Sequence, residues 1–294
     1  MSRRLKLEAW LHARREAWRA AFVRGPWTTF VFEFVSFGIK QGWACLFGGL
    51  MLGVLVVSFL LYPANAPLPR YDFVTLAALA IQAGMLATKL ETWEEARVIF
   101  VFHIVGTVME IFKTDVGSWI YPEPSFLRIA GVPLFSGFMY ASVGSYIARC
   151  WRNFAFRFER FPPIWLQALL AVGVYANFFA HHYIPDIRIG LFIASVLIYG
   201  PCMLYYRPDE KERPMPLVVG LVLVALFIWF AENIGTFTAA WAYPHQKHGW
   251  QIVGIGKLGS WFLLMLISYT LVAAINRPQP MLPRDDQDTE FLPR

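Results

Sequence analysis

Charged residues are scarce in this 294-residue sequence: Asp, Glu, Lys and Arg make up 16% of it, against about a quarter in an ordinary soluble domain. Hydrophobic residues make up 57%, and the mean hydropathy is +0.47. A soluble protein of this size cannot bury so much apolar surface, so the composition indicates a protein embedded in a lipid bilayer. The net charge of +6 then concerns membrane orientation and membrane lipids, and we expect no nucleic acid partner.

Several motifs are also missing. The three cysteines, Cys45, Cys150 and Cys202, match no zinc or disulfide spacing, so we interpret them as packing residues. No Walker A glycine loop is present, which argues against a nucleotide-driven mechanism. The sequence also contains no HExxH or ExxH pair.

Long apolar stretches fill most of the chain. A membrane span needs about 20 mostly apolar residues, and eight segments meet this description: 41–62, 71–89, 97–114, 132–151, 164–182, 187–206, 215–234 and 256–276. The stretch "WTTFVFEFVSFGIK" before them is either an interfacial helix or the lower end of a longer first helix. We therefore predict an all-α, polytopic membrane helix bundle over residues 27–277.

The two ends of the chain differ from this apolar body. Residues 1–26 alternate apolar side chains such as Trp10 and Trp18 with Lys and Arg, which favours an amphipathic helix on an anionic membrane surface over a targeting segment. Residues 278–294 are rich in proline and charge, which predicts a disordered tail.

The distribution of basic residues predicts the orientation of the bundle. With eight spans and a cytoplasmic N terminus, 20 of the 26 Lys and Arg residues fall on the cytoplasmic side. The exceptions are Arg70, Lys113, Arg128, Arg188, Lys247 and Lys257. Both termini are therefore expected in the cytoplasm.

One motif occurs twice, as "MEIFKTDVGSWIYPEPSF" and "AENIGTFTAAWAYPHQKH". In each copy a Glu ends an apolar segment and is followed at the same spacing by Trp, Tyr and Pro. The residues are Glu110, Trp119, Tyr121 and Pro122 in the first copy and Glu232, Trp241, Tyr243 and Pro244 in the second. Four spans separate the copies, which predicts a parallel internal repeat with halves 41–151 and 164–276.

The repeated glutamates are candidate catalytic residues. Glu110 and Glu232 both lie in apolar runs, where a lipid-facing carboxylate would cost a few kcal/mol, so both should face the bundle interior. Together they could share a proton, bind a metal or protonate a substrate. A structural hydrogen-bonding role is the alternative. His103 lies two helical turns before Glu110 on the same face and is the third catalytic candidate.

The segment "FFAHHYIPD" suggests a metal site. His181, His182 and Asp186, with the two glutamates, would suit a divalent metal such as zinc, iron or manganese. The alternative is that these histidines form ordinary hydrogen bonds at a membrane interface.

Aromatic and basic residues around the motifs are candidate substrate-binding residues. They are Trp119, Tyr121, Trp241, Tyr243, Lys113 and Lys257. The aromatic members fit an interfacial aromatic belt equally well, and the lysines fit a solvated loop with salt bridges.

Several segments together resemble a known family. They are "KQGWACLFGGLML", "LATKLETWEEARVIFVFHIVGTVMEIFKT", "GSWIYPEPSF", "GVPLFSGFMYASVGSYIAR", "NFFAHHYIPD", "WFAENIGTF" and "KLGSWFLLMLISY". From about residue 32 to residue 278 the chain is similar to a bacterial integral membrane family catalogued as domain of unknown function 817. The resemblance implies a multi-pass protein of the bacterial inner membrane and implies no reaction.

A second, shorter resemblance concerns chemistry. The pattern of Glu110, Gly117, Trp119 and Tyr121, followed by "GVPLF", resembles membrane proteins of carotenoid biosynthesis. Those enzymes act on long apolar isoprenoids, which implies a buried acid that protonates an alkene.

Three functional hypotheses follow from these patterns. The first is a membrane-embedded enzyme that acts on a lipid or isoprenoid, with an apolar small molecule as ligand and membrane lipids as partners. The second is a small-solute or ion transporter that couples to protons through the same carboxylates. The third is a non-catalytic membrane sensor or assembly factor.

Overall fold

The computed structural model describes residues 3–246, 248–276 and 279–280, and most of them are helical, as predicted. The α-helices in this part of the chain are α1 (Arg3–Phe22), α2 (Pro26–Ala44), α3 (Leu46–Leu61), α4 (Arg70–Ala87), α5 (Trp93–Asp115), α6 (Phe135–Phe154), α7 (Ile164–Ala180), α8 (Arg188–Tyr199), α9 (Leu217–Phe237) and α10 (Gly256–Asn276). A short 3₁₀ helix, η1 (Pro244–Gln246), lies between α9 and α10.

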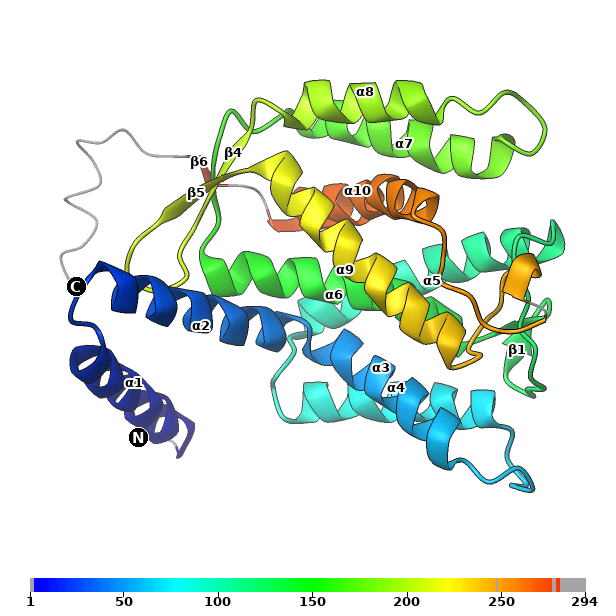
Figure 1. Cartoon of the computed structure of the whole chain (residues 1–294), viewed down its shortest axis with the longest axis horizontal. Coiled ribbons are helices and arrows are strands. Elements are labelled where there is room, and N and C mark those ends of the chain that lie inside the picture. Colours follow the sequence, from blue (N-terminus) through cyan, green and yellow to red (C-terminus); the bar gives the residue numbers. More distant parts are fainter. Residues whose placement is uncertain (1–2, 247, 277–278, 281–294) are drawn as a thin grey trace.

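Consecutive helices from α3 onward run in alternating directions along one long axis, so their connections gather at two ends (Figure 1). The loops 62–69, 116–134 and 181–187, with residues 238–246 and 248–255, lie at one end, which we call the motif end because it holds both copies of the repeated motif. The small β-sheet and the start of α2 lie at the opposite end, which we call the sheet end (Figure 1).

The helices follow the predicted apolar segments with two differences. Segment 187–206 forms a helix only over α8, Arg188–Tyr199, and then continues as a β-strand. The stretch before the first predicted span forms α2, which is bent by 69° from α3. By length and composition, α9 and α10 could each cross a membrane, and the bent pair α2–α3 would add a third span if counted as one.

A four-stranded sheet closes the sheet end, and the sequence did not predict it. Its order is β5 (Arg213–Pro216), β4 (Met203–Tyr206), β3 (Arg157–Glu159) and β6 (Gln279–Pro280). β4 pairs antiparallel with β3 and β5, and β3 pairs parallel with β6. Short apolar runs suit a strand or a helix equally well, so the predicted span 187–206 extends over β4. Residues 281–294 of the predicted tail lie outside the described residues.

A second small sheet lies in the loop between α5 and α6. Its strands β1 (Arg128–Ile129) and β2 (Val132–Pro133) pair antiparallel across Ala130 and Gly131, both of which have positive φ angles. This hairpin is part of the motif end.

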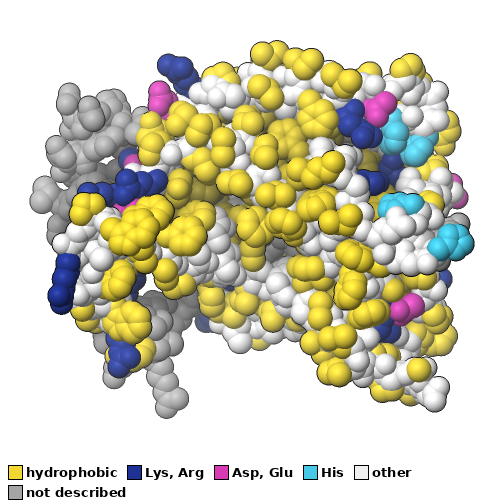
Figure 2. Space-filling model, viewed as in Figure 1, with side chains coloured by type: hydrophobic (Ala, Val, Ile, Leu, Met, Phe, Trp, Pro, Cys, Tyr) yellow, Lys and Arg dark blue, Asp and Glu magenta, His cyan; other side chains and the backbone are white. Residues whose placement is uncertain are grey.

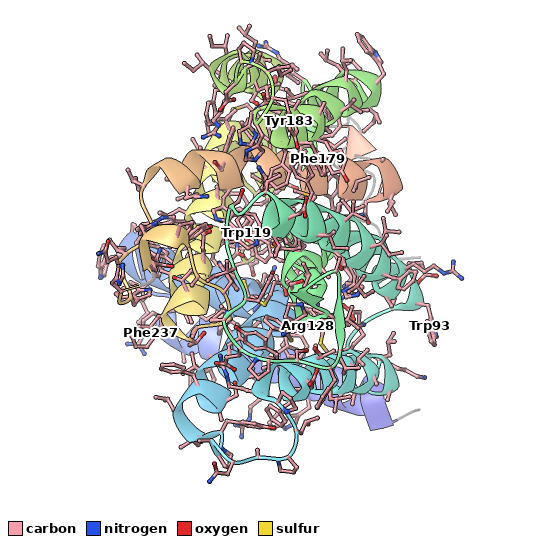
Figure 3. All side chains as sticks on the ribbon, turned by 90° about the vertical axis from the view of Figure 1, so that its right-hand side faces the viewer. Trp93, Trp119, Arg128, Phe179, Tyr183 and Phe237 are labelled. Carbon is pink, nitrogen blue, oxygen red and sulfur yellow. The ribbon has the colours of Figure 1, made fainter. Side chains whose placement is uncertain are left out.

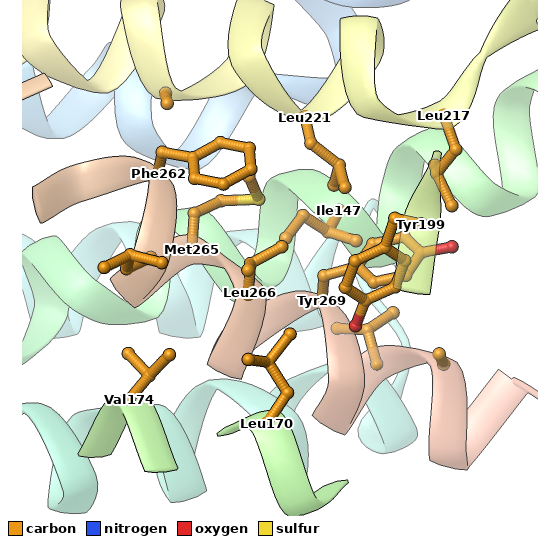
Figure 4. Packing of buried hydrophobic residues seen from close by; sticks show 14 of the residues in the cluster. Ile147, Leu170, Val174, Tyr199, Leu217, Leu221, Phe262, Met265, Leu266 and Tyr269 are labelled. Carbon is orange, nitrogen blue, oxygen red and sulfur yellow. The ribbon is translucent and has the colours of Figure 1, made fainter. Parts of the chain in front are cut away.

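Buried apolar side chains join the second half of the chain around α10 (Figure 4). Met265, Leu266 and Tyr269 of α10 belong to one cluster with residues of α6, α7, α8 and α9, including Leu170 and Leu221. A separate cluster joins α3, α4 and the start of α6. The core therefore consists of helix–helix contacts.

Helices α5 and α6 pack closely because glycine lines their contact. A Cβ atom at Gly106 would lie 2.7 Å from the Cβ of Tyr140, and one at Gly144 would lie 2.4 Å from the ring of Phe102. Small residues let two helix backbones approach each other, as is common in membrane bundles.

Hydrophobic side chains cover much of the surface between the two ends (Figure 2). Leu61, Leu197 and Phe227 are 75%, 71% and 69% exposed. Lys and Arg side chains gather at the sheet end of this face, and histidines gather at the motif end (Figure 2). A wide apolar surface between polar ends matches the expectation of a membrane environment.

Candidate functional site

Glu110 lies 5% exposed near the end of α5, where three aromatic side chains donate hydrogen bonds to it. Trp119 Nε1 donates to Oε2 at 2.6 Å, and Tyr140 OH donates to Oε1 at 2.8 Å. The hydroxyl of Tyr121 also donates to Oε2. Two donors come from the loop that follows Glu110 and the third from α6, so the carboxylate joins the loop to the bundle.

Glu232 lies 2% exposed near the end of α9 and has a closely similar environment. Tyr243 OH donates to its Oε1 and Trp261 Nε1 donates to its Oε2. Tyr243 comes from the loop after α9, and Trp261 comes from α10. Each glutamate therefore accepts a hydrogen bond from the tyrosine eleven residues later and another from an aromatic side chain of the next helix.

The two motif loops contact each other through equivalent residues. Ile120 and Ala242, each ten residues after its glutamate, form an antiparallel β-bridge with two N–H···O bonds of 2.9 Å. An antiparallel pair between matching positions is what a local two-fold arrangement produces, because each residue makes the same contact as its counterpart. The bridge brings the C-terminal ends of α5 and α9 together.

Both helices also end in the same way. Seven residues after each glutamate, Gly117 and Ala239 have φ angles of +73° and +53°. The next amide bonds back to the helix in both copies, Ser118 to the Lys113 carbonyl at 2.9 Å and Ala240 to the Gly235 carbonyl at 3.0 Å. This pattern is a Schellman helix end. Glycine adopts it without cost, whereas Ala239 holds it against an unfavourable steric contact.

Aromatic rings separate the two carboxylates. The ring centroids of Trp119 and Tyr243 lie 6.1 Å apart, and those of Tyr140 and Trp261 also lie 6.1 Å apart. Each pair joins one hydrogen-bond donor of Glu110 to one hydrogen-bond donor of Glu232. The glutamates interact electrostatically across this layer.

The two loop tyrosines act as neutral donors. Burial, followed by the nearby charge of Glu110, raises the pKa of Tyr121 well above its ordinary value. Burial, followed by Glu232, likewise raises the pKa of Tyr243. Both phenols therefore keep their protons at physiological pH and can donate to a carboxylate.

The start of α4 holds both motif loops in place. Arg70 forms an ion pair of 2.6 Å with Glu123 of the first loop and donates to the Thr238 carbonyl of the second at 2.9 Å. Tyr71 OH donates to the Ala239 carbonyl at 2.7 Å. Asp72 accepts bonds from Ser125 and from the amides of residues 126 and 127.

Lys257 lies beside the aromatic layer at the start of α10. Its Nζ is 4.4 Å from the ring centroid of Tyr243 and 5.8 Å from that of Trp119. Its charge also interacts with Glu232. This places a cation over the rings of two side chains that donate hydrogen bonds to the carboxylates.

The predicted residues divide into those that join this site and those that do not. Trp119 and Tyr243 are buried and donate hydrogen bonds to the carboxylates, so they do not belong to an exposed aromatic belt. Trp241 makes no hydrogen bond to Glu232. Its ring lies over Gly235, where an added Cβ would come within 2.3 Å of it. Figure 3 views the motif end and shows Trp119 near its middle.

His103 lies on the predicted helix but away from Glu110. Its ring is 4.4 Å from that of Phe138, and its Nδ1 atom is buried without a hydrogen-bond partner. The structure therefore gives no direct contact through which His103 could act on the carboxylate.

The predicted metal ligands make other contacts. Asp186 accepts hydrogen bonds from Asn177 and pairs with Arg188 at 3.1 Å. His181 Nδ1 bonds to the Asn177 carbonyl at 2.8 Å. Among the described residues, no group of three or more His, Cys, Asp or Glu lies close enough together to hold a metal ion. A divalent metal at this position stays a prediction.

Sequence reasoning missed Tyr140, Trp261 and Arg70. Tyr140 and Trp261 follow their glutamates by 30 and 29 residues, so their similar spacing could have been found by extending the repeat into the next helix. Arg70 stood out only as a basic residue on the outer side of the predicted bundle, which gave no sign of its contacts with both loops.

Comparison with known proteins places these residues in a family. A family model described as "Protein of unknown function (DUF817)" matches residues 33–269. The chain belongs to this family. It is also 37% identical over 260 residues to "Uncharacterized protein YoaT" of Bacillus subtilis (strain 168), covering 88% of this chain and 98% of the relative. No solved structure matches the chain.

Proposed function

We propose that this DUF817 protein crosses the bacterial inner membrane eight times, with α1 on the cytoplasmic surface. The alternating helix directions, the apolar surface and the basic sheet end support this topology. Helix α8 is 12 residues long and spans about 18 Å of a hydrocarbon core of about 30 Å. The strand that follows contributes to that crossing, since Cys202 and Leu204 are buried in protein.

Cysteine labelling tests this topology. In a cysteine-free protein, Phe126→Cys at the motif end should react with a membrane-impermeant maleimide in intact cells. Lys211→Cys at the sheet end should react only after permeabilisation. Labelling of both positions from the same side would contradict the proposal.

Within that topology, the function that the geometry supports best is a carrier that moves a small solute together with protons. The supporting observation is that the two halves meet through equivalent residues, at Ile120 and Ala242, with a buried glutamate on each side. Carriers built from repeated halves place their sites between those halves. Residues 41–151 and 164–276 would be these halves.

The chemistry assigned to the site is proton binding and release. A buried carboxylate that gains a proton loses its charge, and the tyrosine and tryptophan donors stabilise the charged form. Motion of one half relative to the other would change the donors available to each carboxylate and so change its proton affinity. The two glutamates interact, so they would titrate as a pair.

Proteoliposomes that contain a pH-sensitive dye test the carrier. The wild type should show proton uptake driven by a gradient of at least one solute in a panel of Na⁺, K⁺, phosphate and short carboxylates. Glu110→Gln and Glu232→Gln should abolish this flux while the protein stays folded. Glu94→Gln is the matched control, because Glu94 lies exposed at the other end of α5. Unchanged flux in both glutamine variants would refute the proposal.

The second candidate is a membrane-embedded enzyme that acts on a lipid or isoprenoid. An open pocket of about 450 Å³ favours it, since Val108, Ile111, Phe112 and Phe179 give it an apolar wall. The first three lie on a different face of α5 from Glu110. Neither glutamate lines the pocket, and for this reason the carrier is preferred. Mass spectrometry of lipids that co-purify with the protein would test this candidate.

A further inference from the structure

Lys113 is a buried lysine whose contacts are unusual. It is 4% exposed, and its Nζ lies 2.9 Å from His182 Nε2 and 3.5 Å from His181 Nε2. The same ammonium lies 4.2 Å from the ring centroid of Phe178. In the described part of the chain, no carboxylate forms an ion pair with it. A buried charge normally has a partner of opposite sign.

The surroundings of Lys113 hold more positive than negative charge. Lys257 and Arg188 both interact electrostatically with it, and Arg188 also interacts with Lys257. Asp186 is the carboxylate that opposes them at Lys113, and it already pairs with Arg188 at 3.1 Å. Three cations from α5, α8 and α10 therefore interact with one another, and the opposing carboxylates are Asp186 and, at Lys257, Glu232. The excess of positive charge favours an anion.

The cluster can be reached from the motif end. His182 is exposed in the loop between α7 and α8, and Arg188 and Lys257 are half-buried. Basic, acidic and histidine side chains lie together near the motif end of the face shown in Figure 2, and Figure 3 labels Phe179 and Tyr183 at that end. An anion could therefore reach His182 and the accessible parts of Arg188 and Lys257 from the motif end, whereas Lys113 is buried behind the surface.

His181 is held in one orientation. Its Nδ1 bonds to the Asn177 carbonyl, which leaves Nε2 facing Lys113. The ammonium of Lys113 has three N–H donors, and at most two of them serve the histidines. The third donor, with the charges of Lys257 and Arg188, is available to an oxyanion.

We propose a binding site for a phosphate group at the motif end of the bundle, formed by Lys113, His182, Arg188 and Lys257. The phosphate is either free in solution or the head group of a lipid. The apolar pocket of Val108, Ile111 and Phe112 lies beside the cluster, because the Phe112 ring is 5.9 Å from that of His182. The pocket adjoins the cluster through His182, and Lys113 does not line it.

This site goes beyond the proposed carrier and does not depend on it, because binding can be measured without flux. Isothermal titration calorimetry on the purified full-length protein at low salt would use two probes. Inorganic phosphate represents the soluble source, and dihexanoyl phosphatidic acid represents the lipid source. Dihexanoyl phosphatidylcholine, whose head group carries no net charge, is the comparison ligand.

We expect at least one phosphate probe to bind. Lys113→Gln should weaken it by about tenfold or more, as loss of a charge-assisted hydrogen bond predicts. Arg128→Gln removes a charge from an exposed position at the same end and should change affinity by less than about twofold. Because Lys113 is buried, His182→Gln provides a second variant on the surface, where a loss of about threefold or more is expected.

The outcomes separate the sources and can refute the site. Binding of inorganic phosphate alone identifies a soluble anion, and tighter binding of phosphatidic acid identifies a lipid. Failure of both probes to bind the wild type would overturn the inference. So would wild-type affinity in both Lys113→Gln and His182→Gln. Loss of proton flux in the glutamate variants with phosphate binding intact would leave both proposals standing.

Discussion

Removing the hydroxyl of Tyr243 should destabilise the protein more than removing that of Tyr121, although the motif positions are equivalent. In Glu110, the oxygen that accepts from Tyr121 also accepts from Trp119. In Glu232, the oxygen that accepts from Tyr243 has no second donor among the described residues. Tyr243→Phe therefore leaves a buried carboxylate oxygen without a partner, whereas Tyr121→Phe does not.

The magnitudes follow from this difference. Loss of a hydrogen bond to a charged group costs about 1.5–3 kcal/mol, and a bond whose acceptor keeps another donor is worth about 0.5–1.5 kcal/mol. Bonds between helices in membrane bundles fall in a lower range, with an average of about 0.6 kcal/mol. We therefore expect the free energy of unfolding to fall by about 1.5–3 kcal/mol in Tyr243→Phe and by about 1 kcal/mol or less in Tyr121→Phe.

Unfolding in sodium dodecyl sulfate, followed by tryptophan fluorescence, measures both variants. Tyr183→Phe is the control, because Tyr183 is 75% exposed and such a change should alter stability by less than about 0.5 kcal/mol. A double-mutant cycle between Glu232→Gln and Tyr243→Phe isolates the pair itself. Equal losses in Tyr121→Phe and Tyr243→Phe, or a larger loss in Tyr121→Phe, would refute the reasoning.

Two further predictions concern packing and charge. Gly106→Ala should destabilise the protein by about 1–3 kcal/mol, because its Cβ would meet the Cβ of Tyr140, which no side-chain rotation can move. Gly84→Ala, with nothing within 4 Å, should be neutral or slightly stabilising in the same unfolding assay; equal effects would contradict the close packing of α5 and α6. Burial lowers the pKa of His182, and the charges of Lys113 and His181 lower it further. The pKa measured by NMR titration should therefore lie below the ordinary value of about 6.5. Lys113→Gln removes a positive charge that opposes the imidazolium and should move that pKa upward; a shift downward would contradict the contact.

The apolar segments were predictable because helix formation in a membrane depends on local composition. Each predicted segment overlaps one of the helices α3 to α10, and segment 256–276 coincides with α10. The prediction of one continuous helix over 187–206 was wrong, because the apolar run that forms a strand at Met203 has the same composition as a helix. The bend of 69° between α2 and α3 was left open, because the stretch before the first predicted span fits either an interfacial helix or the lower end of a longer first helix.

The sequence by itself determined that two glutamates end apolar segments and are followed by Trp and Tyr at the same spacing. Only the tertiary structure decided which aromatic side chains bind them. Trp119 reaches its glutamate, but Trp241 lies over Gly235 and leaves Glu232 to Trp261. The physical reason is that spacing along a chain fixes the backbone distance between two residues, whereas a side chain's direction follows from the space that its neighbours leave. Arg70 joins both loops for the same reason, since that contact exists only after the start of α4 packs against them.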